Sequence, residues 1–461
     1  LGRVMYNFDS KYLVTASFRR DGTSNFGPEN KWGNFPSFSA AWKVNEDFLK
    51  NVDEITMLKI RLGWGMTGNS DIGRFRYQTN LTTPNNFQTV FGEDQQREMA
   101  MNEWYSVGNP IIKWEAAKMT NVGIDLNMFR NKLQFSAEYY MKKQNDLLFE
   151  VPVSGINGKF DDWNTQGTGV WYNIGEIHNT GFEFDLRYAE MSGSFTYEVF
   201  SNLSTVTNSV DYIPQTITIG SNITTIGHTI GSLYGYVADR IIQESDFDED
   251  GTYLHAEPSE GEPAPGDLKF KDLNRDGVIS DKDRTIIGKG IPDMTYSFGL
   301  NTGYRNFDLS LYFYGVENVQ VLNALRSNIE SFSDQDLDHN KSSRWYQNYY
   351  SEDNPSTEFV RLDPNNNNHN DRTSTWWVED ASFLRLKEFQ VGYTIPENLT
   401  ELAGISRFRI YLSGINLITF TRYKGYDPEA PLNTNDPKKT GVDYNTYPVP
   451  RSLNAGLQII F

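Results

Sequence analysis

One segment of the sequence has residue types and spacing that could hold a metal ion. Counting Asp272 as position 1, oxygen-bearing side chains fall at positions 1, 3, 5, 9 and 12, a backbone carbonyl falls at position 7, and Gly277 occupies the sharp turn at position 6. A hard cation such as calcium needs several oxygens at about 2.3–2.6 Å, which alternate residues of a tight loop can supply. The segment therefore predicts a structural Ca²⁺ site. Its expected ligands are Asp272, Asn274, Asp276, Val278, Ser280 and Asp283.

Two features separate this segment from an EF-hand. Position 12 is Asp283, where EF-hands use a bidentate Glu, and no periodic helix precedes Asp272. The segment is therefore similar to the isolated calcium loop of dockerins. The simpler alternative is an Asp-rich surface turn that binds no metal.

Other motifs that could do chemistry are weak. The glycines of 63–68 match G-x-G-x-x-G, but they lie on an alternating strand that no helix follows, so we expect no nucleotide site. Five scattered histidines without H-E-x-x-H, and no cysteine at all, argue against zinc. Loop carboxylates could pair as in a glycoside hydrolase, but spacing alone does not show such a pair. We therefore predict no enzyme activity.

Tryptophans in the expected loops could contact a substrate. Aromatic faces stack on sugars, and nearby Asp and Asn side chains can bind hydroxyl groups. Interfacial girdles and loop cores use aromatic residues as well, which is the simpler explanation for any single tryptophan. The candidate substrate-binding residues are Trp104, Trp163, Trp171, Trp345, Trp376 and Trp377.

Composition excludes several classes of protein. The 461 residues carry a net charge of −18, which opposes binding to nucleic acid. Aromatic residues reach 14% although the mean hydropathy is −0.57. No apolar run is long enough for a transmembrane helix. The wall of a membrane barrel fits this composition, because its strands are only half apolar.

The dominant sequence period is two. From Leu133 to Met141 every second residue is apolar or aromatic and the residues between are mostly polar, which places the two kinds on opposite faces of a strand. Several such segments have about ten residues, enough for a tilted strand to cross a bilayer. We predict thirteen strands: 4–8, 12–20, 36–44, 58–66, 121–128, 133–142, 182–188, 195–202, 295–304, 307–314, 389–395, 407–417 and 452–461.

The connections between these strands alternate in length. The short ones are 9–11, 130–131, 189–194, 305–306 and 396–404; the long ones are 21–34, 67–117, 145–180, 205–294, 315–382 and 418–451. Only 45–56 is intermediate. We therefore predict an all-β, antiparallel transmembrane β-barrel wall with short periplasmic turns and long extracellular loops. The loop 205–294 carries the calcium-loop-like motif.

The C-terminal strand alternates apolar residues with others and ends on an aromatic. This pattern is similar to the assembly signal of outer-membrane proteins, which implies the barrel assembly machinery and outer-membrane lipid as partners. An ordinary terminal strand is the alternative. The residues that carry the signal are Gly456, Leu457, Ile459 and Phe461.

Seven ordered segments resemble the SusC/RagA-type TonB-dependent transporters of Bacteroidota. They are 57–69 (MLKIRLGWGMTGN), 179–184 (NTGFEF), 230–236 (IGSLYGY), 265–277 (PGDLKFKDLNRDG), 383–387 (FLRLK), 423–428 (YKGYDP) and 447–451 (YPVPR). The resemblance covers essentially residues 1–461 and implies the C-terminal part of a plugged barrel of roughly 22 strands. The chain starts at Leu1 without a signal peptide, so we expect a fragment or mature piece.

The resemblance also implies a function. It implies import of a glycan or peptide across the outer membrane, a SusD-like surface lipoprotein as partner, and a TonB complex that acts through a plug outside these residues. Two alternatives stay open: a secreted all-β carbohydrate-binding protein or hydrolase with a dockerin-like loop, and a barrel used for adhesion or signalling.

Overall fold

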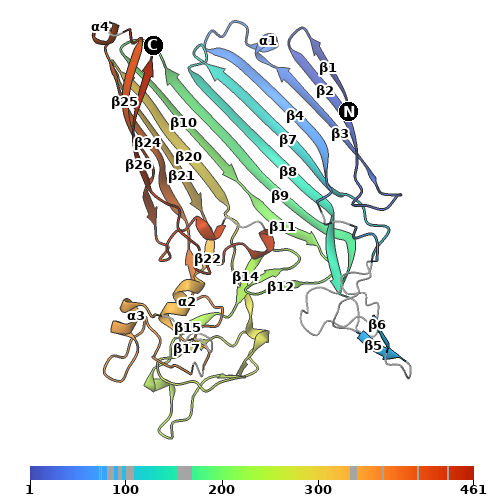
Figure 1. Cartoon of the computed structure of the whole chain (residues 1–461), viewed down its shortest axis with the longest axis vertical. Coiled ribbons are helices and arrows are strands. Elements are labelled where there is room, and N and C mark those ends of the chain that lie inside the picture. The colour runs from blue at the N-terminus through green and yellow to red at the C-terminus, as the bar shows by residue number, and fades with distance from the viewer. Residues whose placement is uncertain are drawn as a thin grey trace. The chain divides into compact units, whose positions relative to one another are not determined.

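In the computed structural model, long antiparallel strands dominate the chain (Figure 1). The structure describes residues 1–461 except 72, 74, 80–87, 92–95, 100–107, 153–168, 333–339, 366–367, 402–403 and 433–435. The long strands pair in one sheet in the order β1-β2-β3-β4-β7-β8-β9-β10-β20-β21-β24-β25-β26, and β11 pairs with β9. All thirteen predicted strands are therefore confirmed. The chain divides into two compact units, Leu1–Leu186 with Thr207–Thr216, and Arg187–Val206 with Ile217–Phe461.

The first unit is a run of consecutive antiparallel strands. Its short turns contain residues in the left-handed conformation, such as Asp9 and Ser10 with φ of +53° and +55° between β1 and β2. Its elements are β1 (Gly2–Phe8), β2 (Tyr12–Gly22), β3 (Trp32–Lys43), α1 (Asn45–Phe48), β4 (Ile55–Asn69), β5 (Gln88–Phe91), β6 (Gln96–Met99), β7 (Glu115–Met128), β8 (Leu133–Pro152), most of β9 (Gly169–Glu190) and β11 (Thr207–Tyr212).

The second unit continues the same strand pattern. The strands are β10 (Phe195–Thr205), β20 (Met294–Tyr304), β21 (Phe307–Glu317), β24 (Phe383–Ile395), β25 (Arg407–Thr421) and β26 (Ser452–Ile460), and α4 (Glu397–Thr400) lies between β24 and β25. Short connections after β20 and β24 alternate with long ones after β10, β21 and β25, as predicted.

Many strands are longer than predicted, and they lengthen at the long-loop end. The segment expected at 182–188 is the end of β9, which begins at Gly169 and so occupies much of the loop expected at 145–180. We attribute the missed residues to the loss of alternation where a strand leaves the bilayer, because both of its faces can then be polar.

The long connections of the second unit fold together into a body with its own core, which we call the loop body: 217–293, 318–382 and 422–451. The sequence analysis assigned these residues to long loops and predicted no strand or helix within them. Instead, the loop body contains β12 (Ile217–Ile219), β13 (Asn222–Thr224), β14 (Ser232–Gly235), β15 (Ala238–Ile241), η2 (Glu244–Asp246), β16 (Glu257–Pro258), β17 (Leu268–Phe270), β18 (Val278–Ile279), η3 (Asp281–Asp283), β19 (Thr285–Gly288), β22 (Gln320–Leu322), α2 (Ala324–Glu330), α3 (Ser343–Asn348), β23 (Val378–Asp380), η5 (Ala430–Leu432) and η6 (Pro437–Lys439).

The core of the loop body draws on all three connections. Leu233, Leu268, Leu322 and Trp377 are buried in one cluster, against which Val442 packs. Backbone hydrogen bonds join the same connections, since Leu322 N donates to Gly441 O at 2.8 Å. The loop body is therefore a folded unit rather than a set of independent loops.

The two faces of the long strands differ in chemistry. Leu62, Val122 and Leu412 are 51%, 46% and 56% exposed, so the apolar face is not covered by the described part of the chain. A water-soluble protein rarely leaves such a surface open. No helix among the described residues is long and apolar enough to cross a membrane.

Candidate functional site

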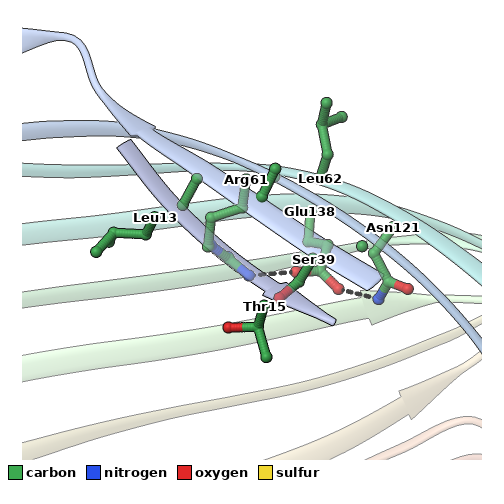
Figure 2. A pocket seen from close by; sticks show the side chains of 11 residues that line it. Leu13, Thr15, Ser39, Arg61, Leu62, Asn121 and Glu138 are labelled. Atoms are coloured by element: carbon green, nitrogen blue, oxygen red, sulfur yellow. Dashed lines mark hydrogen bonds and ion pairs between the residues drawn. The ribbon is translucent and has the colours of Figure 1, made fainter. Parts of the chain in front are cut away.

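The polar face of the first unit has a charged cluster centred on Arg61 of β4. Arg61 Nη1 donates to Glu138 Oε2 of β8 at 2.7 Å, and Arg61 Nη2 lies 2.9 Å from Asp125 Oδ1 of β7. Lys59 forms a second ion pair with Asp125 at 2.6 Å. Arg61 and Glu138 line a pocket of about 290 Å³ together with small residues such as Ser39. Figure 2 shows Arg61 reaching toward Glu138 at this pocket.

Glycine permits this arrangement, because Arg61 has to cross β7 to reach β8. A Cβ at Gly123 would lie 3.0 Å from Arg61 Nη2, whereas a Cβ at Gly63 would meet only Asn121 Cβ, at 3.8 Å. We predict that Gly123→Val displaces the guanidinium and destabilises the barrel by about 1–3 kcal/mol. The midpoint of heat-modifiable gel mobility should fall for Gly123→Val and change less for Gly63→Val. Equal midpoints for the two variants would contradict the inference that Arg61 crosses β7 over Gly123.

The polar face of the second unit has the same arrangement, in which an arginine crosses a glycine of the neighbouring strand to reach a carboxylate on the next strand. Arg409 of β25 extends over Gly392 of β24, and its Nε donates to Asp308 Oδ1 of β21 at 2.8 Å. Paired charges of this kind leave a face that water can cover, as in the interior of transport barrels. The arrangement can hydrate and guide a polar solute.

An ion-pair cluster fixes the connection after β25 to the wall. Arg385 of β24 is buried, and its two Nη atoms lie 2.7 Å from Asp427 and 2.7 Å from Glu429. Beside this cluster the buried Tyr423 hydroxyl donates to Asp443 Oδ2 at 2.6 Å, and burial together with this carboxylate raises the pKa of Tyr423. The connection is thus anchored at several buried points.

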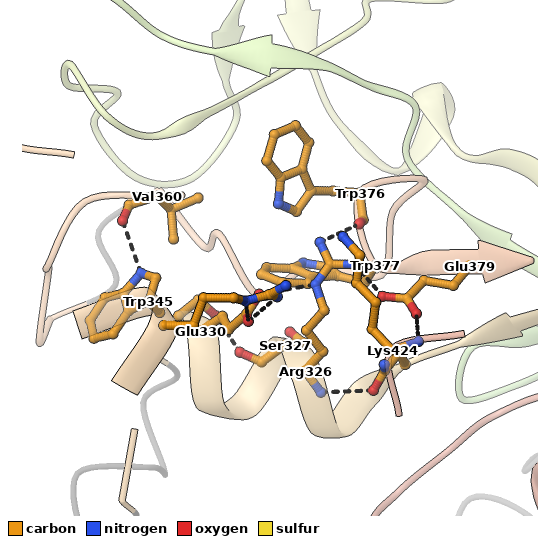
Figure 3. A network of polar contacts seen from close by, with 12 residues as sticks. Arg326, Ser327, Glu330, Trp345, Val360, Trp376, Trp377, Glu379 and Lys424 are labelled. Carbon is orange, nitrogen blue, oxygen red and sulfur yellow. Dashed lines mark hydrogen bonds and ion pairs between the residues drawn. The ribbon is translucent and has the colours of Figure 1, made fainter. Parts of the chain in front are cut away.

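A second cluster stiffens the loop body around Arg326 of α2. Figure 3 shows its guanidinium among Glu330, Glu379 and the carbonyl of Trp376. Nε donates to Glu330 at 3.0 Å and Nη2 to Trp376 O at 3.1 Å, and Nη1 pairs with Glu379. The guanidinium also lies 5.0 Å from the ring of Trp377.

The structure divides the predicted tryptophans. Trp345 and Trp377 are each only 1% exposed, so neither can stack on a substrate, and the prediction is wrong for both. Their indole N–H groups donate to Val360 O and Asn370 O at 3.0 and 2.9 Å, because the loop body uses these residues as its core.

The other tryptophans have different surroundings. Trp376 is half-buried at the edge of the loop-body core. Trp171 packs against Phe26 and Ile112, with Arg76 3.9 Å above its ring. Trp104 and Trp163 lie outside the described residues. Of the four candidates that the structure describes, Trp376 and Trp171 therefore keep partly open side chains.

The predicted calcium segment forms a tight loop that its own hydrogen bonds hold. Asp272 carboxylate oxygens accept from Arg275 N at 2.6 Å and Gly277 N at 2.8 Å, and Asn274 Oδ1 accepts from Asp276 N at 2.9 Å. Gly277 takes φ of +85°, as the sharp turn requires. Within the described residues, no three carboxylate, imidazole or thiol groups form a cluster able to hold a metal.

Asp283, the expected position-12 ligand, has a second role in the structure. It is buried and accepts from Leu273 N and Ser280 N, both at 2.8 Å. Burial opposes its ionisation, but these backbone donors outweigh burial, and the pKa of Asp283 is lowered. The carboxylate therefore closes the loop from within.

The loop body has another buried carboxylate that sequence reasoning missed. Asp246 is 2% exposed, and it accepts from Arg240 Nη1 at 2.6 Å and from Gln243 N at 2.9 Å, with His255 Nε2 at 2.7 Å. Arg240 is the main cause that holds the pKa of Asp246 well below its usual 3.8, against the opposing effect of burial.

We predict a loss of loop-body stability in acid. Because folding lowers the pKa of Asp246, its contribution is fully present above its ordinary value of 3.8 and is lost as the pH falls toward the folded value. The protection of residues 240–255 from hydrogen exchange, measured relative to the intrinsic rate at each pH, should therefore fall below pH 3.8 in the wild type. Asp246→Asn should flatten this dependence, and the exposed Glu249→Gln should leave it unchanged; a profile unaffected by Asp246→Asn would contradict the prediction.

The C-terminal strand has the predicted alternation. Leu457 and Ile459 lie on the apolar face and are 64% and 43% exposed, while Gly456 faces the other way, where the ring of Tyr411 covers it. Phe461 follows the last paired residue, Ile460. The role of this strand in assembly stays a prediction.

This fold defines a membrane β-barrel wall of the outer membrane, with an apolar outer face and a polar inner face. The chain belongs to the family described as "TonB dependent receptor-like, beta-barrel", whose profile matches residues 2–417. This membership sets aside the secreted-protein alternative and places the chain in the outer membrane. The periplasmic position of the short turns and the extracellular position of the long connections stay predictions.

Relatives support the same family. The chain is 33% identical to TonB-dependent receptor P3 of Formosa agariphila, covering 100% of this chain and 45% of the relative. It is 30% identical to TonB-dependent receptor SusC of Bacteroides thetaiotaomicron, covering 100% and 43%. It matches the structure of the RagAB peptide importer in the "open-open" state with a TM-score of 0.80 at 24% identity, covering 100% and 46%. The chain thus spans less than half the length of these relatives.

Proposed function

We propose that this chain forms the distal part of a barrel that imports a nutrient oligomer across the outer membrane. The observation that carries the proposal is the polar inner face of this barrel wall, whose charges are paired across one intervening strand, as in Arg61 with Glu138 and Arg409 with Asp308. Such a wall can pass a hydrated solute without holding it through strong unpaired charges. Import of this kind makes and breaks no covalent bond.

The proposed substrate is a glycan or a peptide oligomer. The half-buried ring of Trp376, which packs at the edge of the loop-body core, favours a glycan, since aromatic faces stack on sugars. The fold shared with a peptide importer favours a peptide. Growth of a deletion strain on single defined glycans and peptides separates these classes. Loss of growth on one class, restored by the full-length gene, is the expected result, and unchanged growth on every oligomer would contradict import.

We propose two protein partners for the whole protein. A SusD-like surface lipoprotein would cover the extracellular side, where the loop body offers a preformed surface, and a TonB complex would act through a plug. A tagged full-length protein purified from outer membranes should carry a SusD-like lipoprotein in near-equal amount. Purification without any such lipoprotein, in mild detergent, would contradict this assignment.

We also propose that the loop 272–283 binds Ca²⁺ as a structural ion. Asp272, Asn274, Asp276, Val278 and Ser280 supply oxygens of the type that calcium prefers. Asp283 would join them only by giving up its backbone donors. Titration calorimetry of the full-length protein should show calcium uptake that Asp276→Ala abolishes and that Asp281→Ala, at an exposed position outside the ligand set, preserves. If the wild-type protein took up no calcium, the proposed Ca²⁺ site would be refuted.

A further inference from the structure

The connection between β3 and β4 differs from the other periplasmic turns of the first unit. It is the intermediate connection of the sequence and contains the short helix α1 (Asn45–Phe48). Figure 1 shows α1 at the end of β3 and β4. Phe48, the last residue of α1, is 72% exposed although it is a large apolar residue.

Phe48 continues a row of aromatic rings from the apolar face of the wall. Ring centroids lie 6.5 Å apart for Tyr6 and Phe8, 6.4 Å for Phe8 and Tyr12, 6.3 Å for Tyr12 and Trp42, and 5.9 Å for Trp42 and Phe48. The first four residues face the bilayer from β1, β2 and β3. The row therefore carries the bilayer-facing surface past the ends of the strands and onto α1.

Asp47 fixes the polar tips of this row. Its carboxylate accepts from Tyr12 OH and Trp42 Nε1, both at 3.0 Å, and lies 3.1 Å from Lys11 Nζ. The Trp42 N–H is the main cause that lowers the pKa of Asp47, followed by Lys11 and Tyr12. The polar groups thus converge on one carboxylate at the strand ends while the rings project outward.

We propose that α1 is a lipid anchor that inserts Phe48 into the periplasmic leaflet of the outer membrane, with Asp47 as the positioning residue at the level of the headgroups. The occupant is phospholipid, because the surface of α1 is continuous with the face that already contacts the bilayer. Tyr and Trp rings suit the boundary between the acyl chains and the headgroups, because the apolar body of the ring contacts lipid and its polar group contacts water. An exposed phenylalanine on a turn that met only water would leave its apolar surface uncovered.

Site-directed fluorescence in nanodiscs tests the anchor in the full-length protein. The 461 residues contain no cysteine, so Phe48→Cys introduces the only thiol in this part of the protein. An environment-sensitive fluorophore on this thiol should be quenched several-fold more by nitroxide-labelled phospholipid than the same label on Lys50→Cys, which lies two residues further along and is also exposed. Aqueous iodide should give the opposite order.

Two results would overturn the proposal. Quenching of the Phe48 label by iodide but not by lipid would place α1 in the periplasm, and protection from both quenchers would mean that protein covers it. Asp47→Ala should lower lipid quenching at position 48 without changing the heat-modifiable mobility of the barrel. Asp53→Ala, at an exposed position of the same turn, should leave the quenching unchanged.

Discussion

Replacing Arg385 with methionine is expected to release the connection after β25 from the barrel wall. Asp427 is 5% exposed and has Arg385 as an ion-pair partner, so the variant leaves a buried carboxylate uncompensated. Loss of one partner of a buried ion pair costs about 3–5 kcal/mol. Hydrogen exchange measured by mass spectrometry should accelerate many-fold in residues 422–432 and little in β25.

A matched variant on the next strand controls for the loss of an arginine. Arg407 of β25 is exposed, so Arg407→Met should leave exchange in 422–432 at the wild-type rate. Arg385→Lys keeps the charge but not the two-pronged geometry, and it should fall between wild type and Arg385→Met. If Arg385→Met exchanged as slowly as Arg407→Met, the anchoring role of Arg385 would be refuted.

Two adjacent tryptophans are expected to respond in opposite ways. Trp377→Ala removes a fully buried ring from the core of the loop body and should destabilise it by about 3–5 kcal/mol. Limited proteolysis should then cut within 318–382. Trp376→Ala should leave the loop body resistant to protease, because Trp376 is only half-buried at the edge of that core.

Substrate binding provides the second readout for this pair. If Trp376 contacts substrate, Trp376→Ala should weaken binding by the folded protein several-fold. Resistance of Trp377→Ala to protease, or cutting of both variants alike, would contradict the division between core and surface.

The strands of the wall could be predicted because one face of each strand contacts lipid and the other face contacts water. Lipid on one face and water on the other impose strict alternation, which is visible in residues such as Leu62, Val122 and Ile124. The short turns, such as 9–11 and 305–306, could be placed as well, because they are the gaps between strands whose alternation is clear. The ends of the strands could be predicted less accurately, because the alternation of apolar and polar residues is lost outside the bilayer.

The loop body could not be predicted in the same way. Its strands have two to four residues, too few to show a period, and its core joins Leu233, Leu322 and Val442, which are far apart in the chain. Arg385 and Asp427 both lie in segments that resemble the family. No local pattern indicates that they pair across 42 residues.

Residue type alone also misassigned part of the candidate site. Tryptophan suits both a sugar-binding surface and a protein core, and only the fold shows that Trp345 and Trp377 belong to the core. The spacing of 272–283 predicted a tight turn correctly. It did not indicate that Asp283 would be held by backbone N–H groups.

Spin labels placed one at a time along β7, from Asn121 to Met128, test most directly whether lipid covers the apolar face of these strands. In the full-length protein in bilayers, labels at Val122 and Ile124 should collide mainly with oxygen dissolved in lipid, and labels at Gly123 and Asp125 mainly with a water-soluble nickel complex. The two accessibilities should therefore alternate out of phase, with a period of two. Protection of Val122 and Ile124 from both reagents would contradict a bilayer-facing wall.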